Sequence, residues 1–182
     1  YTSEQVKPYL QFEGYENVGR LYEEKLEVRT FTAQDVKVPG EKALVGQLTV
    51  VANRRIAKGE IVGVYGGTVL PRGLYGADGN AFTMTVGSRA VYEEGAYVTE
   101  PVSLSGDNIL SRINTCFEYD AKGNPIRQAR VGYNVETVPF NVETDMLLGV
   151  APEVKTVRKG FLLNTVWATE DIPAGAELRL DY

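Results

Sequence analysis

The chain has 182 residues and a mass of 20.0 kDa, enough for one domain with a sizeable core or one domain with a small appendage. With 43% hydrophobic and 24% charged residues it has an ordinary soluble composition, and no apolar run approaches the roughly 20 residues that span a bilayer. A single cysteine and the absence of histidine exclude internal disulfides, cysteine-rich zinc sites, histidine-ligated metals and histidine-based catalytic triads, and the net charge of -5 disfavours duplex nucleic acid as a partner.

Residues 1–43 are predicted to form a flank of helical and extended segments. Within it, four apolar residues recur at helical spacing between residues 15 and 28: Val18, Leu21, Tyr22 and Leu26. We expect one short amphipathic helix here, packed on the edge of a β core, although a glycine in its interior weakens it.

From residue 44 onward, short β-branched and alternating apolar runs replace the helical pattern. The 19 glycines and 8 prolines are spread along the whole chain, which favours many short strands over long helices. We predict strands over residues 48–51, 61–65, 81–86, 96–99, 131–140 and 161–168. Residues 120–125 have the composition of a turn between strands, and residues 141–160 form a polar connection that resembles an insertion.

One segment of the sequence occurs twice, at residues 52–64 and 168–180. Each copy places an alanine, an isoleucine and a glycine at the same offsets: Ala52, Ile56 and Gly59, then Ala168, Ile172 and Gly175. Two copies suggest two pseudo-symmetric halves of one domain, since a solenoid needs at least three stacked units. The alternative is that both copies are one common way of joining two strands.

Familiar catalytic motifs are absent, including the phosphate-binding G-x-x-x-x-G-K-[ST] and the nucleophile elbow G-x-S-x-G. The carboxylate pairs at residues 93–94 and 170–171 lie in turn-like polar surroundings and are predicted to be solvated surface charge. Tyrosine is frequent, with 11 copies, and Tyr65 and Tyr182 end strands beside glycine or the terminus. By composition alone, both tyrosines could equally be half-buried aromatic residues of strands, with the hydroxyl pointing outward.

The segment at residues 168–182 resembles the closing segment of SET-domain lysine methyltransferases, which reads Ala, a charged pair, Ile-Pro-x-Gly-Glu-Glu-Leu and Tyr-x-Tyr. Asn-Ile-Leu-Ser-Arg-Ile-Asn-Thr-Cys at 108–116 resembles the family's Asn-x-x-Arg-Phe-Ile-Asn-His-Ser-Cys. Residues 52–70, 97–100 and 133–136 resemble its opening block, its Tyr-Ile-Asp-Ala strand and its Pro-Asn-Cys-Glu. The blocks stand in the family's order and cover roughly residues 44–182. The resemblance implies a mainly β, SET-like β-clip fold of small sheets with a pseudoknot and a short N-terminal helix. It also implies that residues 108–116 and 168–182 lie side by side, with Tyr182 near Asn114.

This resemblance also implies S-adenosylmethionine as the cofactor and methyl transfer to a lysine of a protein or peptide. Methyl transfer is an in-line displacement, so the lysine amine must be neutral and aligned with the methyl group of the sulfonium. An apolar channel and the sulfonium charge both lower the pKa of lysine from about 10.4, so no histidine base is required. By resemblance, Tyr182 is the catalytic hydroxyl and Tyr65 lines the lysine channel. Trp167 and Leu180 are candidates for the channel walls, with a place in the core as the alternative for Trp167.

The cofactor-binding residues implied by the resemblance are five: Asn114, Thr115, Ser111, Leu48 and Thr49. Asn114 would bind the amino-acid end of the cofactor, and Thr115 stands where the backbone of the family's histidine meets the adenine. Ser111 occupies the family's arginine position, while Leu48 and Thr49 fall where the family has Gly-x-Gly. No metal is expected. Asn114 has a structural alternative, the satisfaction of a buried loop backbone.

These departures from the family pattern, with Leu180 in place of the first tyrosine of Tyr-x-Tyr, keep other functions open. One is a non-catalytic SET-like or β-clip module that binds a peptide or a protein. Another is a β-clip domain that binds a carbohydrate or small ligand, because Ile-Pro-x-Gly-x-x-Leu also occurs there. Under every hypothesis we expect a soluble intracellular protein, in the cytoplasm or nucleus, with no membrane partner. Only the methyltransferase hypothesis requires S-adenosylmethionine.

Overall fold

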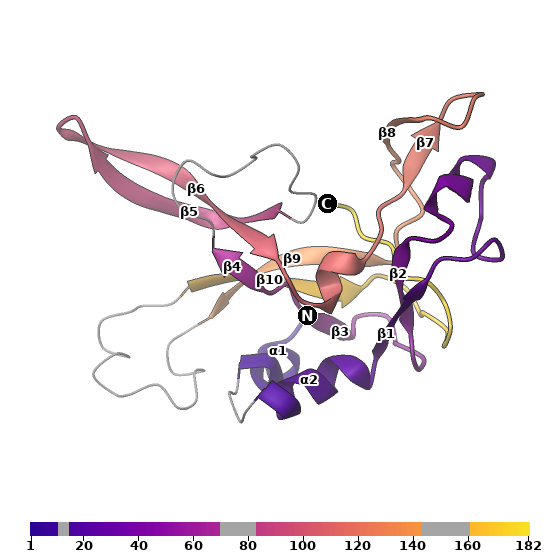
Figure 1. Ribbon diagram of the computed structural model, residues 1–182. Helices are drawn as coiled ribbons and strands as arrows, with labels where there is room; N and C mark the ends of the chain where they lie inside the picture. The colour runs from indigo at the N-terminus through magenta and orange to yellow at the C-terminus, as the bar shows by residue number, and fades with distance from the viewer. Residues whose placement is uncertain (11–14, 70–82, 143–160) are drawn as a thin grey trace.

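The structure is a computed structural model that describes residues 1–10, 15–69, 83–142 and 161–182 (Figure 1). The helices are α1 (Ser3–Leu10), α2 (Tyr15–Glu23) and the 3-10 helices η1 (Pro39–Leu44) and η2 (Ile109–Arg112). The strands are β1 (Leu26–Thr30), β2 (Leu48–Ala52), β3 (Ile61–Val64), β4 (Gly67–Val69), β5 (Thr83–Glu93), β6 (Ala96–Gly106), β7 (Phe117–Tyr119), β8 (Pro125–Gln128), β9 (Val135–Val142) and β10 (Phe161–Ala168).

The described strands form four small antiparallel sheets, in the orders β1-β2, β3-β10-β9, β4-β6-β5 and β7-β8. The prediction of a mainly β chain of small sheets is therefore confirmed. No helix among the described residues is long and apolar enough to cross a membrane. The hairpin β5–β6 projects from the body of the molecule, and the hairpin β7–β8 rises on the other side (Figure 1).

Most of the predicted strands are present, with different ends. β2, β3 and β10 lie where the apolar runs placed them, and Asp120 accepts hydrogen bonds from backbone N–H groups inside the predicted turn between β7 and β8. β5 and β6 are longer than predicted, because they pair along a hairpin whose last pair is Glu93 with Ala96, next to Tyr92 and Tyr97, which are both mostly exposed. β9 begins only at Val135. Residues 81–82, and 143–160 of the predicted insertion, lie outside the described residues.

The N-terminal residues differ from the prediction in two ways. α2 ends at Glu23, so Leu26 lies in β1 and not in a helix that continues to residue 28. The Asn53 side chain donates to the carbonyls of Glu23 (2.7 Å) and Leu26 (3.1 Å) and so fixes this change of direction. β1 then pairs with β2, which satisfies its backbone and buries Leu26. α1 was not predicted; its one fully buried side chain is Val6.

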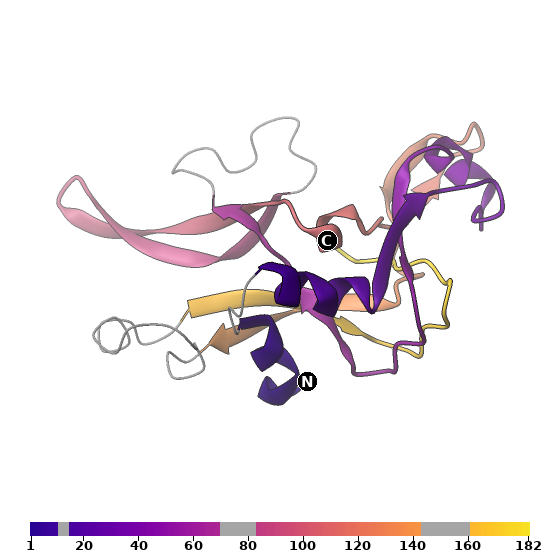
Figure 2. The same ribbon diagram turned by 60° about the horizontal axis from the view of Figure 1, so that its bottom comes forward.

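Both α-helices pack against β3; they lie below the sheet β3-β10-β9 in Figure 1 and come forward, toward the viewer, in Figure 2. The Tyr22 hydroxyl donates to the Val64 carbonyl (3.0 Å), and the Lys25 ammonium donates to the Ile61 carbonyl (2.9 Å). Tyr22 comes so close to the strand that a Cβ at Gly63 would lie 2.5 Å from its ring. A glycine is therefore needed at this position of β3.

The two copies of the repeat pair with each other reciprocally. The N–H of Ile56 donates to the carbonyl of Ile172 (2.9 Å), and the N–H of Ile172 donates back (2.8 Å). The N–H of Gly59 donates to Ala168 (2.8 Å), and the N–H of Gly175 donates to Ala52 (2.7 Å). Both glycines have positive φ, 78° and 82°, which glycine adopts without strain. The predicted pseudo-symmetry is present as a local twofold exchange of hydrogen bonds.

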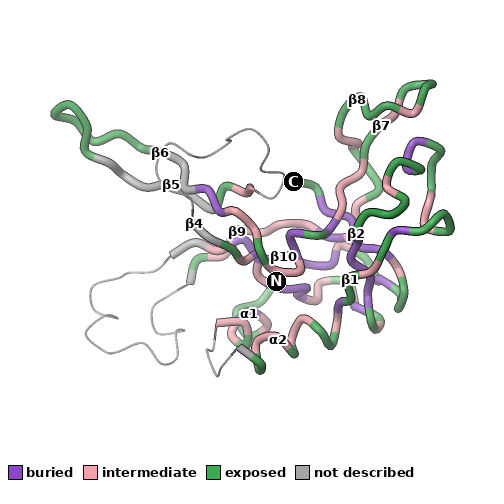
Figure 3. Tube along the Cα trace, in the orientation of Figure 1, coloured by how far each residue is buried: buried purple, intermediate pink, exposed green. Residues whose placement is uncertain are grey.

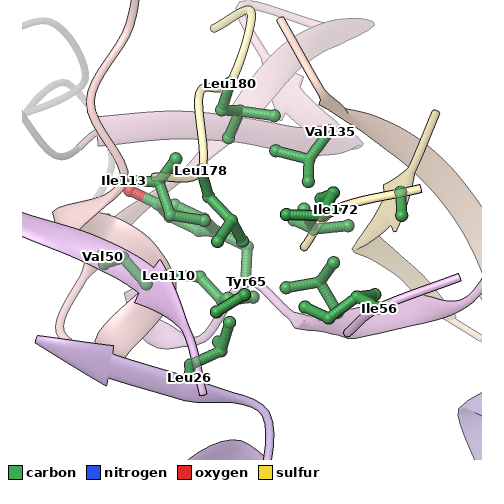
Figure 4. Packing of buried hydrophobic residues seen from close by; sticks show 14 of the residues in the cluster. Leu26, Val50, Ile56, Tyr65, Leu110, Ile113, Val135, Ile172, Leu178 and Leu180 are labelled. Carbon is green, nitrogen blue, oxygen red and sulfur yellow. The ribbon is translucent and has the colours of Figure 1, made fainter. Parts of the chain in front are cut away.

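The core lies where β1, β2, β3, β10 and the C-terminal segment meet, whereas the tip of the β5–β6 hairpin is exposed (Figure 3). Ile56 and Ile172 of the two repeat copies pack in it with Leu26, Tyr65 and Leu178 (Figure 4). A second, smaller cluster contains Val6, Ile61 and Trp167. The core therefore joins the repeated turns to the residues around Tyr65.

The C-terminal segment, residues 176–182, runs between three other segments and is hydrogen-bonded to all of them. The N–H of Leu178 donates to Val50 of β2 (2.9 Å), and the N–H of Leu180 donates to Asn114 (3.0 Å). The carbonyl of Arg179 accepts from the N–H of Asn134 (3.2 Å). The sequence predicted that residues 108–116 and 168–182 lie side by side, and these bonds confirm it.

Candidate functional site

A cavity of about 450 Å³ opens where η1, β2, η2 and the C-terminus converge. Its lining combines apolar side chains with a few polar ones: Leu44, Gln47, Leu48, Ser111, Arg112, Ile113, Asn114, Thr115, Phe117 and Tyr182. Four of the five predicted cofactor residues and the predicted catalytic tyrosine are therefore in one place. Among the side chains of these lining residues, only that of Arg112 is charged.

Tyr182 is held at the wall of this cavity by η2. Its hydroxyl donates to the carbonyl of Ile113 (2.9 Å) and lies 3.4 Å from the carbonyl of Leu110. Its ring meets the Tyr65 ring edge to face, with centroids 6.4 Å apart. The structure thus brings together the two tyrosines that the sequence selected, 117 positions apart (182 minus 65).

Tyr65 is 2% exposed and packs among Leu110, Ile113 and Leu178 (Figure 4). Its hydroxyl lies against Gly106 at the end of β6, where a Cβ would come within 2.4 Å of the hydroxyl oxygen. Burial raises the pKa of Tyr65 to about 12, and the nearby Arg112 charge works in the opposite direction. Burial, and then the proximity of Tyr65, also raise the pKa of Tyr182. Both hydroxyls therefore keep their protons throughout the neutral range.

The helix η2 positions the cavity side of residues 111–115. Asn108 caps it, because its side-chain oxygen accepts from the N–H of Leu110 (3.2 Å) while its amide nitrogen donates to the Val64 carbonyl (2.8 Å). The Ser111 hydroxyl returns to the Asn108 carbonyl (2.7 Å). This bonding fixes η2 to the end of β3, beside Tyr65.

Asn114 and Thr115 follow η2 and line the cavity. The Asn114 amide nitrogen donates to Glu177 (3.3 Å) and to the Leu48 carbonyl (3.4 Å). The hydroxyl oxygen of Thr115 is buried and has no hydrogen-bond partner. Thr115 is held through its backbone, since its carbonyl accepts from the Arg179 guanidinium (2.8 Å).

Arg179 organises the back of the cavity, and sequence reasoning missed it. The guanidinium is 1% exposed, pairs with Glu177 (2.8 Å) and Glu41 (3.2 Å), and lies over the Phe31 ring. Glu41 belongs to η1, so the N-terminal residues 1–43 contribute a side chain that holds Arg179 in place behind the cavity. The predicted boundary at residue 43 stays a prediction. The available signal was the unusual arginine between two apolar residues of the closing segment.

Four predicted site residues do not line the cavity: Tyr65, which packs in the main core as described above, and Thr49, Leu180 and Trp167. Thr49 is fully buried and donates its hydroxyl to Glu177 (2.5 Å). Leu180 is also fully buried and lies beside Val135 in the main core (Figure 4). Trp167 packs in the second cluster, where its indole N–H donates to Thr165 (2.6 Å), so the structure agrees with a core position. Trp167 and Leu180 therefore do not form walls of this cavity.

No protein-family model matches the chain, and no curated protein matches it by sequence. Solved structures do match. The structure of ATXR5 in complex with histone H3.1 mono-methylated on R26 aligns with 100% of this chain and 74% of its own, at a TM-score of 0.53 and 16% identity. The chain has the SET fold.

Two further structures were found with lower similarity. The methyltransferase domain of human PR domain-containing protein 2 aligns with 87% of this chain and 77% of its own, at a TM-score of 0.44 and 14% identity. A histone lysine methyltransferase structure solved to explain product specificity aligns with 90% of this chain and 53% of its own, at a TM-score of 0.45 and 14% identity. The SET fold that the sequence blocks predicted is confirmed, as a statement of architecture, by the match to the ATXR5 structure.

Proposed function

We propose that this SET-fold chain transfers a methyl group from S-adenosylmethionine to the side-chain amine of a lysine in a protein or peptide. The observation that carries the proposal is the placement of Tyr182. Its hydroxyl is anchored on the Ile113 carbonyl, beside the buried Tyr65, at the wall of a cavity that residues 111–115 line. A fixed, protonated hydroxyl in apolar surroundings suits a reaction that depends on alignment more than on acid–base chemistry.

The cavity suits the cofactor in size and in chemistry. Its volume of about 450 Å³ falls within the 300–1,000 Å³ that small-molecule sites occupy. Leu48, Ile113 and Phe117 offer apolar contacts to a nucleoside, and Asn114 offers polar ones. When bound, S-adenosylmethionine supplies the methyl group on an activated sulfonium. Asn114 would hold its amino-acid end, and residues 48 and 115 would contact the nucleoside.

The tyrosines would act on the incoming lysine. Because the Tyr182 O–H donates to Ile113, its oxygen lone pairs remain to accept a hydrogen bond from the amine and orient it. Tyr65 and its apolar neighbours exclude water from the approach. Burial in such surroundings lowers the pKa of a lysine amine and favours the neutral, nucleophilic form. No side chain of this chain then needs to act as a general base.

The test is calorimetric titration with S-adenosylmethionine and its product S-adenosylhomocysteine, followed by a methyl-transfer assay on lysine-containing histone peptides. Saturation at 100 times the dissociation constant should stabilise the fold by about 2.7 kcal/mol and raise the melting temperature. Asn114→Ala should weaken binding roughly tenfold. Asn124→Ala is the matched control: the amide of this asparagine donates to Asp120 (3.1 Å) in the turn between β7 and β8 and does not line the cavity, so affinity should stay unchanged. If saturating cofactor leaves the melting curve unchanged, a non-catalytic binding module is the better account.

A further inference from the structure

The side-chain amide of Asn114 lies between two groups that only accept hydrogen bonds. One is the carboxylate of Glu177, whose Oε1 is 3.3 Å from the amide nitrogen, and the other is the Leu48 carbonyl, at 3.4 Å. Turning the amide over would place its oxygen against both acceptors. Such an arrangement leaves two acceptors facing a third with no proton between them, which is unfavourable in a partly buried site. The nitrogen of Asn114 must therefore face Glu177.

Glu177 is itself held rigidly from three directions. Its side chain is 4% exposed, Thr49 donates its hydroxyl to the same Oε1 (2.5 Å), and the Arg179 guanidinium pairs with Oε2 (2.8 Å). The backbone of residue 177 is also fixed, because its carbonyl accepts from the Asn134 side chain (2.8 Å). A buried carboxylate with these partners has no room to rotate away from Asn114.

We infer that Glu177 is a positioning residue that fixes the Asn114 amide with its oxygen toward the cavity, so that the site selects a ligand carrying a hydrogen-bond donor, an ammonium group, at that point. The inference rests on the proposed function, since the ammonium meant is that of the cofactor's amino-acid end. It adds the orientation of Asn114 and the residue that sets it. Glu177 acts only through Asn114, because it does not line the cavity.

The chain provides a matched control in Glu41, the other carboxylate that pairs with Arg179. Glu41 is 5% exposed and lies 3.2 Å from the guanidinium, but the bonds of the Asn114 side chain run to Glu177 and Leu48. Glu177→Gln and Glu41→Gln each remove one buried charge from the same arginine at almost constant shape. They differ in whether an acceptor-only group still faces Asn114, because the glutamine amide in Glu177→Gln can donate as well as accept.

The experiment compares S-adenosylhomocysteine with its deaminated analogue, in which hydrogen replaces the amino group, by calorimetric titration. The wild type should bind the analogue about 10- to 100-fold more weakly, the effect expected of one charge-assisted hydrogen bond. In Glu177→Gln this ratio should fall to threefold or less, because Asn114 is free to turn over. In Glu41→Gln it should stay at the wild-type value, even though both variants melt at lower temperatures.

Each outcome decides a separate point. Failure of the wild type to bind either ligand overturns the proposed function and this inference together. Tight binding of S-adenosylhomocysteine with an unchanged ratio in Glu177→Gln overturns the inference alone, and so does an equal fall in both variants. If Glu177→Gln does not fold, the wild-type ratio decides: a loss below threefold on removal of the ammonium shows that Asn114 presents no acceptor.

Discussion

Replacing Tyr182 by phenylalanine tests the reaction chemistry with the smallest possible change. Tyr182→Phe removes one oxygen, and with it the 2.9 Å hydrogen bond to Ile113 and the longer contact to Leu110, while the ring keeps its edge-to-face packing on Tyr65. One lost hydrogen bond at a half-exposed residue should lower the free energy of unfolding by about 0.5–1.5 kcal/mol. The transition state loses a preorganised hydrogen-bonding group, so methyl transfer should fall by about 10²-fold, or about 2.7 kcal/mol in activation free energy.

The assay is single-turnover transfer of a labelled methyl group to a lysine peptide, with S-adenosylhomocysteine affinity measured in parallel. Affinity should change little, because the substitution removes a group that acts on the amine and not on the cofactor. Tyr133→Phe is the control: its hydroxyl likewise donates to one carbonyl, of Ala129 (2.7 Å), and lies near a second, of Cys116 (3.3 Å), but is outside the cavity lining. Equal turnover in Tyr182→Phe and the wild type would refute the assignment of the catalytic tyrosine even though the fold is right.

One further prediction concerns the packing around Tyr65, and another concerns the ion pair between Arg29 and Asp35. In Gly106→Ala the new Cβ would lie 2.4 Å from the Tyr65 hydroxyl oxygen, so we expect methyl transfer to fall roughly tenfold or more and the free energy of unfolding to drop by about 1–3 kcal/mol. Gly19→Ala, which meets open space in α2, should leave activity unchanged and not lower the melting temperature; similar losses in both variants would contradict the role of Tyr65. The Arg29 guanidinium holds the pKa of Asp35 well below its usual range, so the pair stabilises the fold above about pH 4 and loses this effect as the pH falls through the folded-state pKa. The melting-temperature gap between wild type and Asp35→Asn should therefore narrow from pH 6 toward pH 2, and a gap that stays constant with pH would count against this pair.

Local pattern was enough to predict much of the fold. The short apolar and β-branched runs of β2, β3 and β10 match the observed strands because consecutive residues in them are buried, as in strands that are covered on both faces. The repeated spacing from isoleucine to glycine predicted two equivalent turns, and Ile56 and Ile172 do exchange hydrogen bonds. The resemblance of the sequence blocks to the SET family implied in addition that Tyr182 lies near Asn114, and both residues line the cavity. Such features are visible in sequence because each is a short, contiguous stretch.

The rest depended on contacts between residues far apart in the chain. Leu26 has helical spacing, yet it lies in a strand because pairing with β2 satisfies its backbone and buries its side chain. Trp167 lies in β10, the strand that precedes the closing segment, but it packs with Val6 of α1 and so belongs to a separate cluster. Arg179 is one charged letter among apolar ones, and only the fold places Glu41 and Glu177 on either side of it. A buried charge needs a partner, and no local periodicity encodes which distant carboxylate will supply it. The sequence therefore determined the strands, the repeated turns and the tyrosine pair. Tertiary packing alone decided which polar groups hold the cavity in shape.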